Sequence, residues 1–183
     1  MRVVGGVNCG TTLLAPKACA TRPSSSRLKE GAFMYLDVLG AVEGASVLDL
    51  YAGSGALGFE ALSRGAQSAT FVDNATACTK VIVKNIEKLH YSGSTRTCAR
   101  EVLQFLSTTK NSAEFGLVFI DPPYTVSDGV VFEVLEKLRH LLSPGAVVML
   151  ERSKSSELTA PENYEFLRML VYGDSAVYFV HTQ

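Results

Sequence analysis

The chain has 183 residues, 47% of them hydrophobic, and its 17 Lys and Arg residues nearly balance 18 Asp and Glu residues. This composition predicts one globular domain with a sizeable core and excludes a disordered chain. The formal net charge of −1 excludes a global attraction to nucleic acid or membranes, so any such affinity must come from a local patch. The four cysteines are scattered, without a histidine at ligand spacing, which argues against a disulfide framework or a zinc site. Because no apolar run is long enough to span a bilayer and no signal-peptide core is present, we expect a soluble cytoplasmic protein.

The segment before residue 46 predicts two elements. The stretches "MRVVGG" and "GTTLLAP" indicate a small β-hairpin, and "TRPSSS" leads into a helix with apolar residues at helical spacing. Residues 1–25 contain three cations and no acid, and Arg27 and Lys29 follow, which makes this the most basic region of the chain.

From residue 46 onward, short apolar runs alternate with helical patterns. We expect strands at residues 46–51, 68–73, about 94–98, 115–121 and 146–151. We expect helices at residues 55–63, 74–90 with Asn74 as the N-cap, from about 101, and 128–142, with a turn at "SPG". The alternation predicts an α/β sheet with right-handed crossovers. Two final strands flank Gly173-Asp174, a strong turn signal, and predict an antiparallel hairpin that closes the sheet edge.

The run from Gly53 to Gly58 is a G-x-G-x-x-G loop between a strand and a helix, which aims backbone N–H groups at a ligand. One interpretation is a dinucleotide, with Asp73 on a ribose. Asp49 argues against it, because a carboxylate at the end of the strand repels a pyrophosphate and favours a cation. S-adenosylmethionine carries an ammonium and a sulfonium and no phosphate, so it suits the loop better. Asp73 would bind the ribose in either case, and a tight turn with an incidental Asp49 is the alternative without a ligand.

A second motif, Asp121-Pro122-Pro123-Tyr124, follows the strand "FGLVFI". The prolines fix the backbone and remove two N–H donors, which leaves a carboxylate and carbonyls to accept hydrogen bonds from an amino group. Tyr124 offers a flat face for a base. A proline-rich turn without function is the alternative.

Together these motifs resemble the class I S-adenosylmethionine-dependent methyltransferases that act on exocyclic amines. More closely, the chain resembles the RsmD family of bacterial 16S ribosomal RNA guanine-N2 methyltransferases, through "RVVGG", "TRPSSSRLKEGAF", "AGSGALGFEALSRGA", "DPPY" and "VYGDSAVYFV" in order. The resemblance implies a Rossmann-like sheet, mostly parallel with an antiparallel C-terminal hairpin, plus a small N-terminal β-hairpin. It implies S-adenosylmethionine as cofactor, S-adenosylhomocysteine as product, 16S rRNA within the 30S subunit as partner (guanine 966), and a monomer without metal or membrane. We divide the chain into an RNA-contacting extension, residues 1–25, and a methyltransferase domain, residues 26–183.

The resemblance also implies roles for individual residues. The cofactor would be bound by Asp49, Tyr51, Ala52, Gly53, Ser54, Gly55, Asp73, Asn74 and Glu101. The target guanine would be held by Asp121, Pro122, Pro123 and Tyr124, with Asp121 and the Pro122 carbonyl accepting from its amino group. The family's arginine-rich hairpin run is here the neutral "NCGTTLL", so RNA phosphates would depend more on Arg22, Arg27 and Lys29. The alternatives are a DNA or RNA adenine-N6 methyltransferase, an NAD-dependent oxidoreductase and an RNA-binding adaptor without catalysis.

Overall fold

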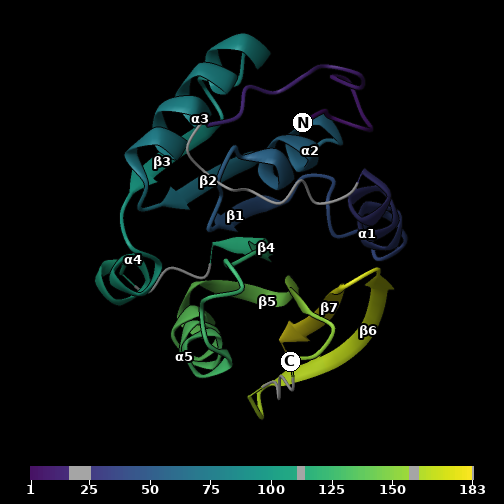
Figure 1. The fold of residues 1–183 in the computed structure, drawn as a ribbon, viewed down its shortest axis with the longest axis vertical. Coiled ribbons are helices and arrows are strands. Elements are labelled where there is room, and N and C mark those ends of the chain that lie inside the picture. The colour runs from purple at the N-terminus through teal and green to yellow at the C-terminus, as the bar shows by residue number, and fades with distance from the viewer. Residues whose placement is uncertain (17–25, 111–113, 157–160, 183) are drawn as a thin grey trace.

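The computed structural model describes residues 1–16, 26–110, 114–156 and 161–182. At its centre is a seven-stranded sheet in the order β3-β2-β1-β4-β5-β7-β6 (Figure 1). The strands are β1 (Ser46–Leu50), β2 (Ser68–Asp73), β3 (Thr95–Ala99), β4 (Phe115–Ile120), β5 (Leu142–Ser153), β6 (Tyr164–Tyr172) and β7 (Ser175–Thr182). The pairs among β1 to β5 are parallel, and β7 is antiparallel to both β5 and β6. The prediction of a mostly parallel α/β sheet with an antiparallel C-terminal hairpin is therefore confirmed.

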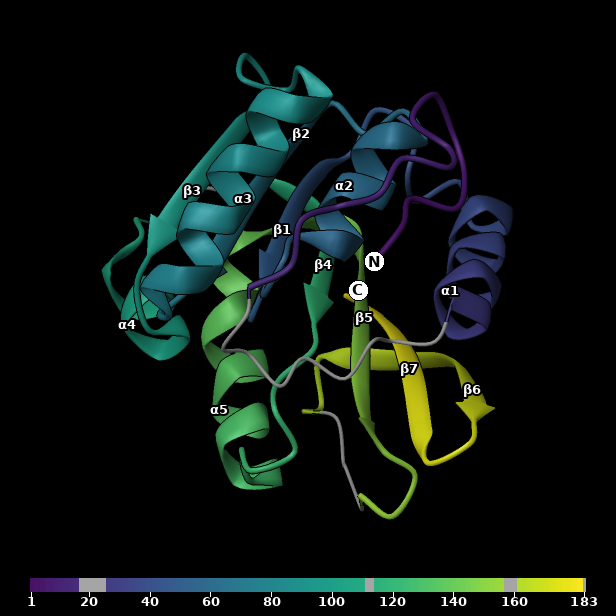
Figure 2. The same cartoon turned by 45° about the horizontal axis from the view of Figure 1, so that its top comes forward.

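Helices cover both faces of the sheet (Figure 2). On one face lie α1 (Ser26–Val38), α2 (Ala56–Ser63) and α3 (Thr76–Leu89), and on the other lie α4 (Val102–Thr108), α5 (Asp128–Leu138) and the 3-10 turn η1 (Arg139–Leu141). Successive strand residues point to opposite faces. In β4, Leu117 and Phe119 therefore join the core under α1 to α3, whereas Val118 and Ile120 join the core under α4 and α5. Burial on both faces explains why this strand is continuously apolar.

The N-terminal segment does not form the expected hairpin of two strands. Its only bridge within the described residues is an isolated antiparallel pair, Arg2 with Thr12. A few backbone hydrogen bonds join its two arms, from the Val3 N–H to Thr11 O at 3.0 Å and from the Leu13 N–H to Met1 O at 2.8 Å, and side chains of the main domain bind other backbone groups of the segment. The Val4 N–H donates to Glu60 at 2.8 Å, and the Asn8 N–H donates to Ser63 Oγ at 2.9 Å. The segment thus pairs with itself over only a few residues, too few to form two strands, and it runs along α2 and α3, as its course in Figure 2 shows.

Three smaller predictions were also wrong. Asn74 does not cap α3, because Ala75 is the N-cap and Asp73 accepts the Ala75 N–H at 2.8 Å. "SPG" is not a turn between elements but lies inside β5, where the pairing with β4 shifts register and Gly145 has a φ of 72°. The helix expected to reach residue 142 ends at Leu138. Among the described helices, none has the length and apolarity needed to cross a membrane.

Candidate active site

Three carboxylates converge at one edge of the sheet. Leu50 at the end of β1 pairs with Val72 of β2 and with Ile120 of β4. The next residues along β2 and the β4 loop are Asp73 and Asp121, so they lie level with the start of the glycine loop. Asp49 lies one position further back in β1. Parallel strands deliver ligand-binding loops to this edge of a doubly wound sheet.

Burial raises the pKa of Asp49 well above its usual range, while the backbone N–H of Gly58 acts in the opposite direction. The nearby charges of Asp121 and Asp73 raise this pKa further. The carboxylate is part of a residue only 1% exposed, and Oδ2 accepts the Gly58 N–H at 3.0 Å. The hydrogen bond from the Gly58 N–H to Asp49 therefore ties β1 to the first turn of α2. A contact between Asp49 and a bound cation stays a prediction.

The glycine loop turns sharply between β1 and α2. Tyr51, Gly53 and Gly55 all have positive φ, of 59°, 57° and 81°. Such backbone is easy for glycine but uncommon for a tyrosine, and this kind of strain is typical of functional sites. Asp73 secures the loop, because its Oδ2 accepts the Gly53 N–H at 2.8 Å.

Gly58 has a packing role. A Cβ at this position would lie 2.4 Å from a ring carbon of Phe71 and 3.1 Å from Asp49 Oδ2. Since real Cβ atoms do not approach so closely, only glycine lets α2 lie this near to β1 and β2. The last glycine of the G-x-G-x-x-G run is thus explained by the contact between helix and sheet.

A buried amide connects the glycine loop with the N-terminal segment. Asn85 of α3 is fully buried, and its Nδ2 donates to Ser54 O and to Leu14 O, both at 3.1 Å. Its Oδ1 accepts the Leu14 N–H at 2.9 Å. The Ser54 hydroxyl also donates to the sulfur of Met1 at 3.4 Å. Sequence reasoning assigned no function to Asn85, although a polar residue on an apolar helix stripe was a signal for one.

The loop after β4 presents the second motif. Pro122 is buried, Asp121 is half-buried, and Pro123 and Tyr124 are exposed, with Tyr124 at 42%. The Tyr124 hydroxyl hydrogen-bonds with Ser175 Oγ at 2.8 Å, which fastens the ring to the start of β7. The loop therefore holds an accessible aromatic ring next to a carboxylate.

Arg152, at the end of β5, fastens the same loop from its other side. Its Nε and Nη2 lie 3.1 and 2.7 Å from Asp128 Oδ1, and Nη2 also donates to Val126 O at 2.8 Å. Its Nη1 is buried and has no hydrogen-bond partner among the described residues. Burial and the charge of Glu101 raise the pKa of Tyr51 to about 12, and the Arg152 charge acts against them. Sequence reasoning missed Arg152, although a cation directly after a buried apolar strand was a usable signal.

Two expected cofactor residues, Glu101 and Asn74, lie in the loops at this edge. Glu101 is the N-cap of α4, and its Oε2 accepts the Gln104 N–H at 2.9 Å. Asn74 is exposed in the turn between β2 and α3. Their contact with a cofactor stays a prediction.

The expected RNA contacts divide into three cases. Arg27 is exposed on α1, and Arg22 lies outside the described residues. The expectation for Lys29 was wrong, because the residue is only 3% exposed and its Nζ lies 3.0 Å from Glu60 Oε2. Glu60 also binds Arg64 at 2.9 Å. Lys29 thus joins α1 to α2 and is not available to a phosphate.

The fold and the site define the class as that of the Rossmann-like methyltransferases. A solved structure described as a putative methyltransferase complexed with SAH, SMU.776, aligns with a TM-score of 0.71 at 14% identity, over 85% of this chain and 50% of the other. At that identity the likeness establishes the fold.

The chain belongs to the family described as conserved hypothetical protein 95, whose model matches residues 1–181. Ribosomal RNA small subunit methyltransferase D of Escherichia coli K12 is 32% identical over 96% of this chain and 87% of the relative. A solved structure, the putative methyltransferase yhhF from Escherichia coli, has a TM-score of 0.86 and 30% identity, over 100% of this chain and 98% of that one. The resemblance to the RsmD family is thereby confirmed.

Proposed function

We propose that this protein transfers a methyl group from S-adenosylmethionine to the exocyclic N2 of a guanine in 16S ribosomal RNA. The observation that carries the proposal is the convergence of Asp49, Asp73 and Asp121 at the edge that also holds the glycine loop. Negatively charged carboxylates gathered in a partly buried site repel an anion and attract a cation. The ammonium and sulfonium of S-adenosylmethionine fit these carboxylates, which accept hydrogen bonds, and the pyrophosphate of a dinucleotide does not.

The residues expected to hold the cofactor lie in three loops of this edge. The backbone of Tyr51, Ala52, Gly53, Ser54 and Gly55 would line the methionine portion, with Asp49 supporting the turn. Asp73 and Asn74 would hold the ribose, and Glu101 the adenine. S-adenosylmethionine, when bound, supplies an activated methyl group.

The loop of Asp121, Pro122, Pro123 and Tyr124 would hold the target base. Guanine N2 is a poor nucleophile because its lone pair is delocalised into the ring. The Asp121 carboxylate and the Pro122 carbonyl would accept its hydrogens, which localises the lone pair and stabilises positive charge on nitrogen in the transition state. Tyr124 would stack on a base that has left its own stack, and the Ser175 bond would hold the ring in place.

The choice of RNA and of guanine rests on the relatives and on the family resemblance. The similar proteins from Escherichia coli and Haemophilus influenzae are both named ribosomal RNA small subunit methyltransferase D. We carry this substrate over to the present chain, with guanine 966 in the assembling or assembled 30S subunit as the expected target and the cytoplasm as the site of action. An adenine-N6 methyltransferase is the alternative, since the same acceptors suit any exocyclic amine.

A transfer assay with tritiated S-adenosylmethionine tests the proposal, with 30S particles, naked 16S RNA and duplex DNA offered in parallel. Label that digests to N2-methylguanosine and disappears in Asp121→Ala supports it. Label in adenine or in DNA overturns it in favour of the alternative. S-adenosylhomocysteine binding by Asp121→Ala, measured by calorimetry, checks that the variant is folded. No label and no cofactor binding in the wild type would refute both the cofactor and the reaction.

A further inference from the structure

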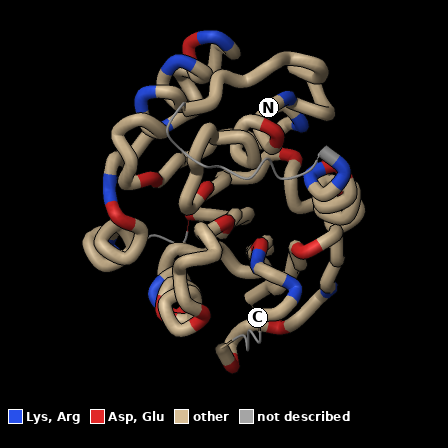
Figure 3. Tube along the Cα trace, in the orientation of Figure 1, with Lys and Arg blue, Asp and Glu red and all other residues tan. Residues whose placement is uncertain are grey.

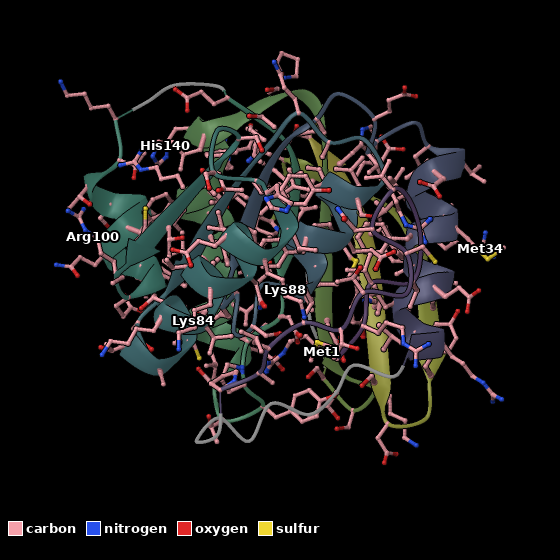
Figure 4. The ribbon with its side chains drawn as sticks, turned by 90° about the horizontal axis from the view of Figure 1, so that it is seen from above. Met1, Met34, Lys84, Lys88, Arg100 and His140 are labelled. Atoms are coloured by element: carbon pink, nitrogen blue, oxygen red, sulfur yellow. The ribbon has the colours of Figure 1, made fainter. Side chains whose placement is uncertain are left out.

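The outer face of α3 carries a row of lysines. Lys80, Lys84 and Lys88 follow one another at intervals of four residues, and all three are exposed. Four helical residues rise about 6 Å, so the row presents one cation per turn along a nearly straight line. Figure 3 shows blue segments, the colour of Lys and Arg, spaced along α3, and Figure 4 shows the labelled Lys84 and Lys88. We call these three residues the lysine row.

This side of the molecule carries a local excess of positive charge. Residues 76–100 contain five cations and one acid, whereas the whole chain has a net charge of −1. The other two cations of this stretch are Arg96 and Arg100, in or next to β3, the edge strand of the sheet. A patch of this kind can attract a polyanion although the chain as a whole does not.

A purely solvated helix face does not account for the row well. Exposed helices gain stability from lysines paired with carboxylates at i,i+4, and like charges at that spacing are destabilising. On α5, Lys137 follows this rule, with its Nζ 3.7 Å from Glu133. In the described part of the chain, Lys80 and Lys84 form no ion pair, and Lys88 donates to the Thr12 carbonyl at 2.6 Å. Glu87, three residues after Lys84, is the one acid among residues 76–100, and it forms no ion pair with the row in the described part of the chain, so the row is not neutralised as Lys137 is.

The position of the row relates it to the candidate active site. α3 begins three residues after Asp73, so Lys80 lies about one turn inside the helix. β2 is two places from β4 in the sheet, which is about 10 Å at the usual strand spacing. A strand of RNA with one base at Asp121 can thus extend its neighbouring nucleotides over α3. At the far end of the row, Lys88 contacts the N-terminal segment, whose "NCGTTLL" run is neutral.

We infer that the lysine row binds the phosphate backbone of RNA beside the target nucleotide. The inference rests on the proposed function, because the RNA is taken to be the methyl acceptor. Phosphates are the complementary partner for a row of point charges with no aromatic ring or fork-shaped donor among them. The row would set the position of the RNA and would not read its sequence.

The test is the double variant Lys80→Gln/Lys84→Gln, with Lys88 kept so that its bond to Thr12 is retained. A fluorescent 16S rRNA fragment is titrated with protein and S-adenosylhomocysteine at several salt concentrations. Each lost phosphate contact lowers the slope of log affinity against log salt by about one, so the double variant should lose about two. Lys137→Gln, at a half-buried lysine on the opposite face of the sheet, should keep the wild-type slope.

Binding and methylation are measured separately, so that failure of the inference about the lysine row can be distinguished from failure of the proposed function. If the double variant keeps the wild-type affinity, salt slope and methylation, then the inference about the lysine row is overturned and the proposed function stays intact. A lowered slope in a protein that methylates no RNA supports the row and removes the proposed function. Normal binding of naked RNA with reduced methylation of 30S particles overturns the inference in favour of a protein partner on the particle. Unchanged S-adenosylhomocysteine affinity and melting temperature establish that the variant is folded.

Discussion

The hydroxyl of Tyr124 and the hydroxyl of Ser175 lie 2.8 Å apart, although 51 residues separate them in the chain. This bond joins the loop after β4 to the first residue of the antiparallel strand β7. It holds a ring that is 42% exposed at the edge where the glycine loop also ends. The C-terminal hairpin thus does more than close the sheet, because it positions the residue proposed to stack on the target base.

Substitutions at Tyr124 should distinguish the contribution of the aromatic ring to catalysis from that of its hydroxyl. Tyr124→Phe and Ser175→Ala remove only the hydrogen bond, worth about 1 kcal/mol, so kcat/KM should fall by about fivefold. Tyr124→Ala also removes the stacking surface, worth about 1–3 kcal/mol per base, and should lower kcat/KM by a further factor of about 5 to 160. Steady-state methylation of 30S particles measures both effects. Equal losses in Tyr124→Phe and Tyr124→Ala would contradict a stacking role.

Arg152 should act by positioning the loop and not by binding the cofactor. Arg152→Met removes the bonds to Asp128 and to the Val126 carbonyl, which leaves the carbonyl without this donor and should lower the stability by about 1–3 kcal/mol. In a domain of this size each kcal/mol lowers the melting temperature by about 2–4 °C. The methylation rate at saturating cofactor should fall, while S-adenosylhomocysteine affinity stays within about twofold.

Lys154→Met is the matched control for Arg152. Lys154 follows β5 directly, but its side chain is exposed and pairs with Asp174 at 2.9 Å. This variant should keep both its melting temperature and its rate. An Arg152→Met enzyme that melts earlier but keeps the wild-type rate at low temperature would assign Arg152 to stability alone.

The sequence predicted the centre of the sheet because strands such as β1 and β4 are buried on both faces, and it predicted the loops because glycines and prolines mark them. It failed where a residue's environment comes from distant parts of the chain. Lys29 was expected at the surface, but its partner Glu60 lies on another helix. The N-terminal hairpin was expected from local pattern, but Glu60 and Asn85, 56 and 71 residues away from their partners, bind its backbone. The role of Arg152 depends on the pairing of β5 with β4, which brings its side chain to the loop after β4, and the sequence alone does not show this pairing.

Asp49 should make the stability of the free protein depend on pH. Burial raises the pKa of Asp49 in the folded state above the value of about 3.9 that it has in the unfolded state. At a pH between these two pKa values, the folded state binds more protons than the unfolded state. The free energy of unfolding should therefore fall as pH rises from about 4 to the folded pKa and show no further contribution above it. Asp49→Asn does not titrate and can still accept the Gly58 N–H, so it should lack this part of the slope.

Melting temperatures of the wild type and Asp49→Asn between pH 5 and 9 measure this difference. The variant should be the more stable at high pH, by about 2–4 °C for each kcal/mol, and the two curves should converge toward acid. S-adenosylmethionine affinity of the variant should fall at the same time, since the proposed cation loses a carboxylate. A constant difference across this pH range would mean that Asp49 does not titrate there.

Asn85 should couple the N-terminal segment to the glycine loop. Asn85→Ala leaves the Leu14 N–H and carbonyl, and the Ser54 carbonyl, without their partner, at a cost of about 1–3 kcal/mol for each group that stays buried. We expect faster amide hydrogen exchange in residues 1–16 together with a several-fold loss of S-adenosylhomocysteine affinity. Hydrogen-exchange mass spectrometry and calorimetry on the same samples measure the two effects.

Asn8→Ala provides the comparison that isolates the coupling. Asn8 fastens the same segment, with its Nδ2 2.6 Å from the Tyr91 hydroxyl, but it makes no bond to the glycine loop. Its loss should speed exchange in residues 1–16 and leave cofactor affinity unchanged. If both variants weaken the cofactor equally, then the whole segment supports the loop and Asn85 has no special part. If neither variant does, the loop is held by Asp73 and its own glycines, because the Gly53 N–H to Asp73 bond survives both substitutions.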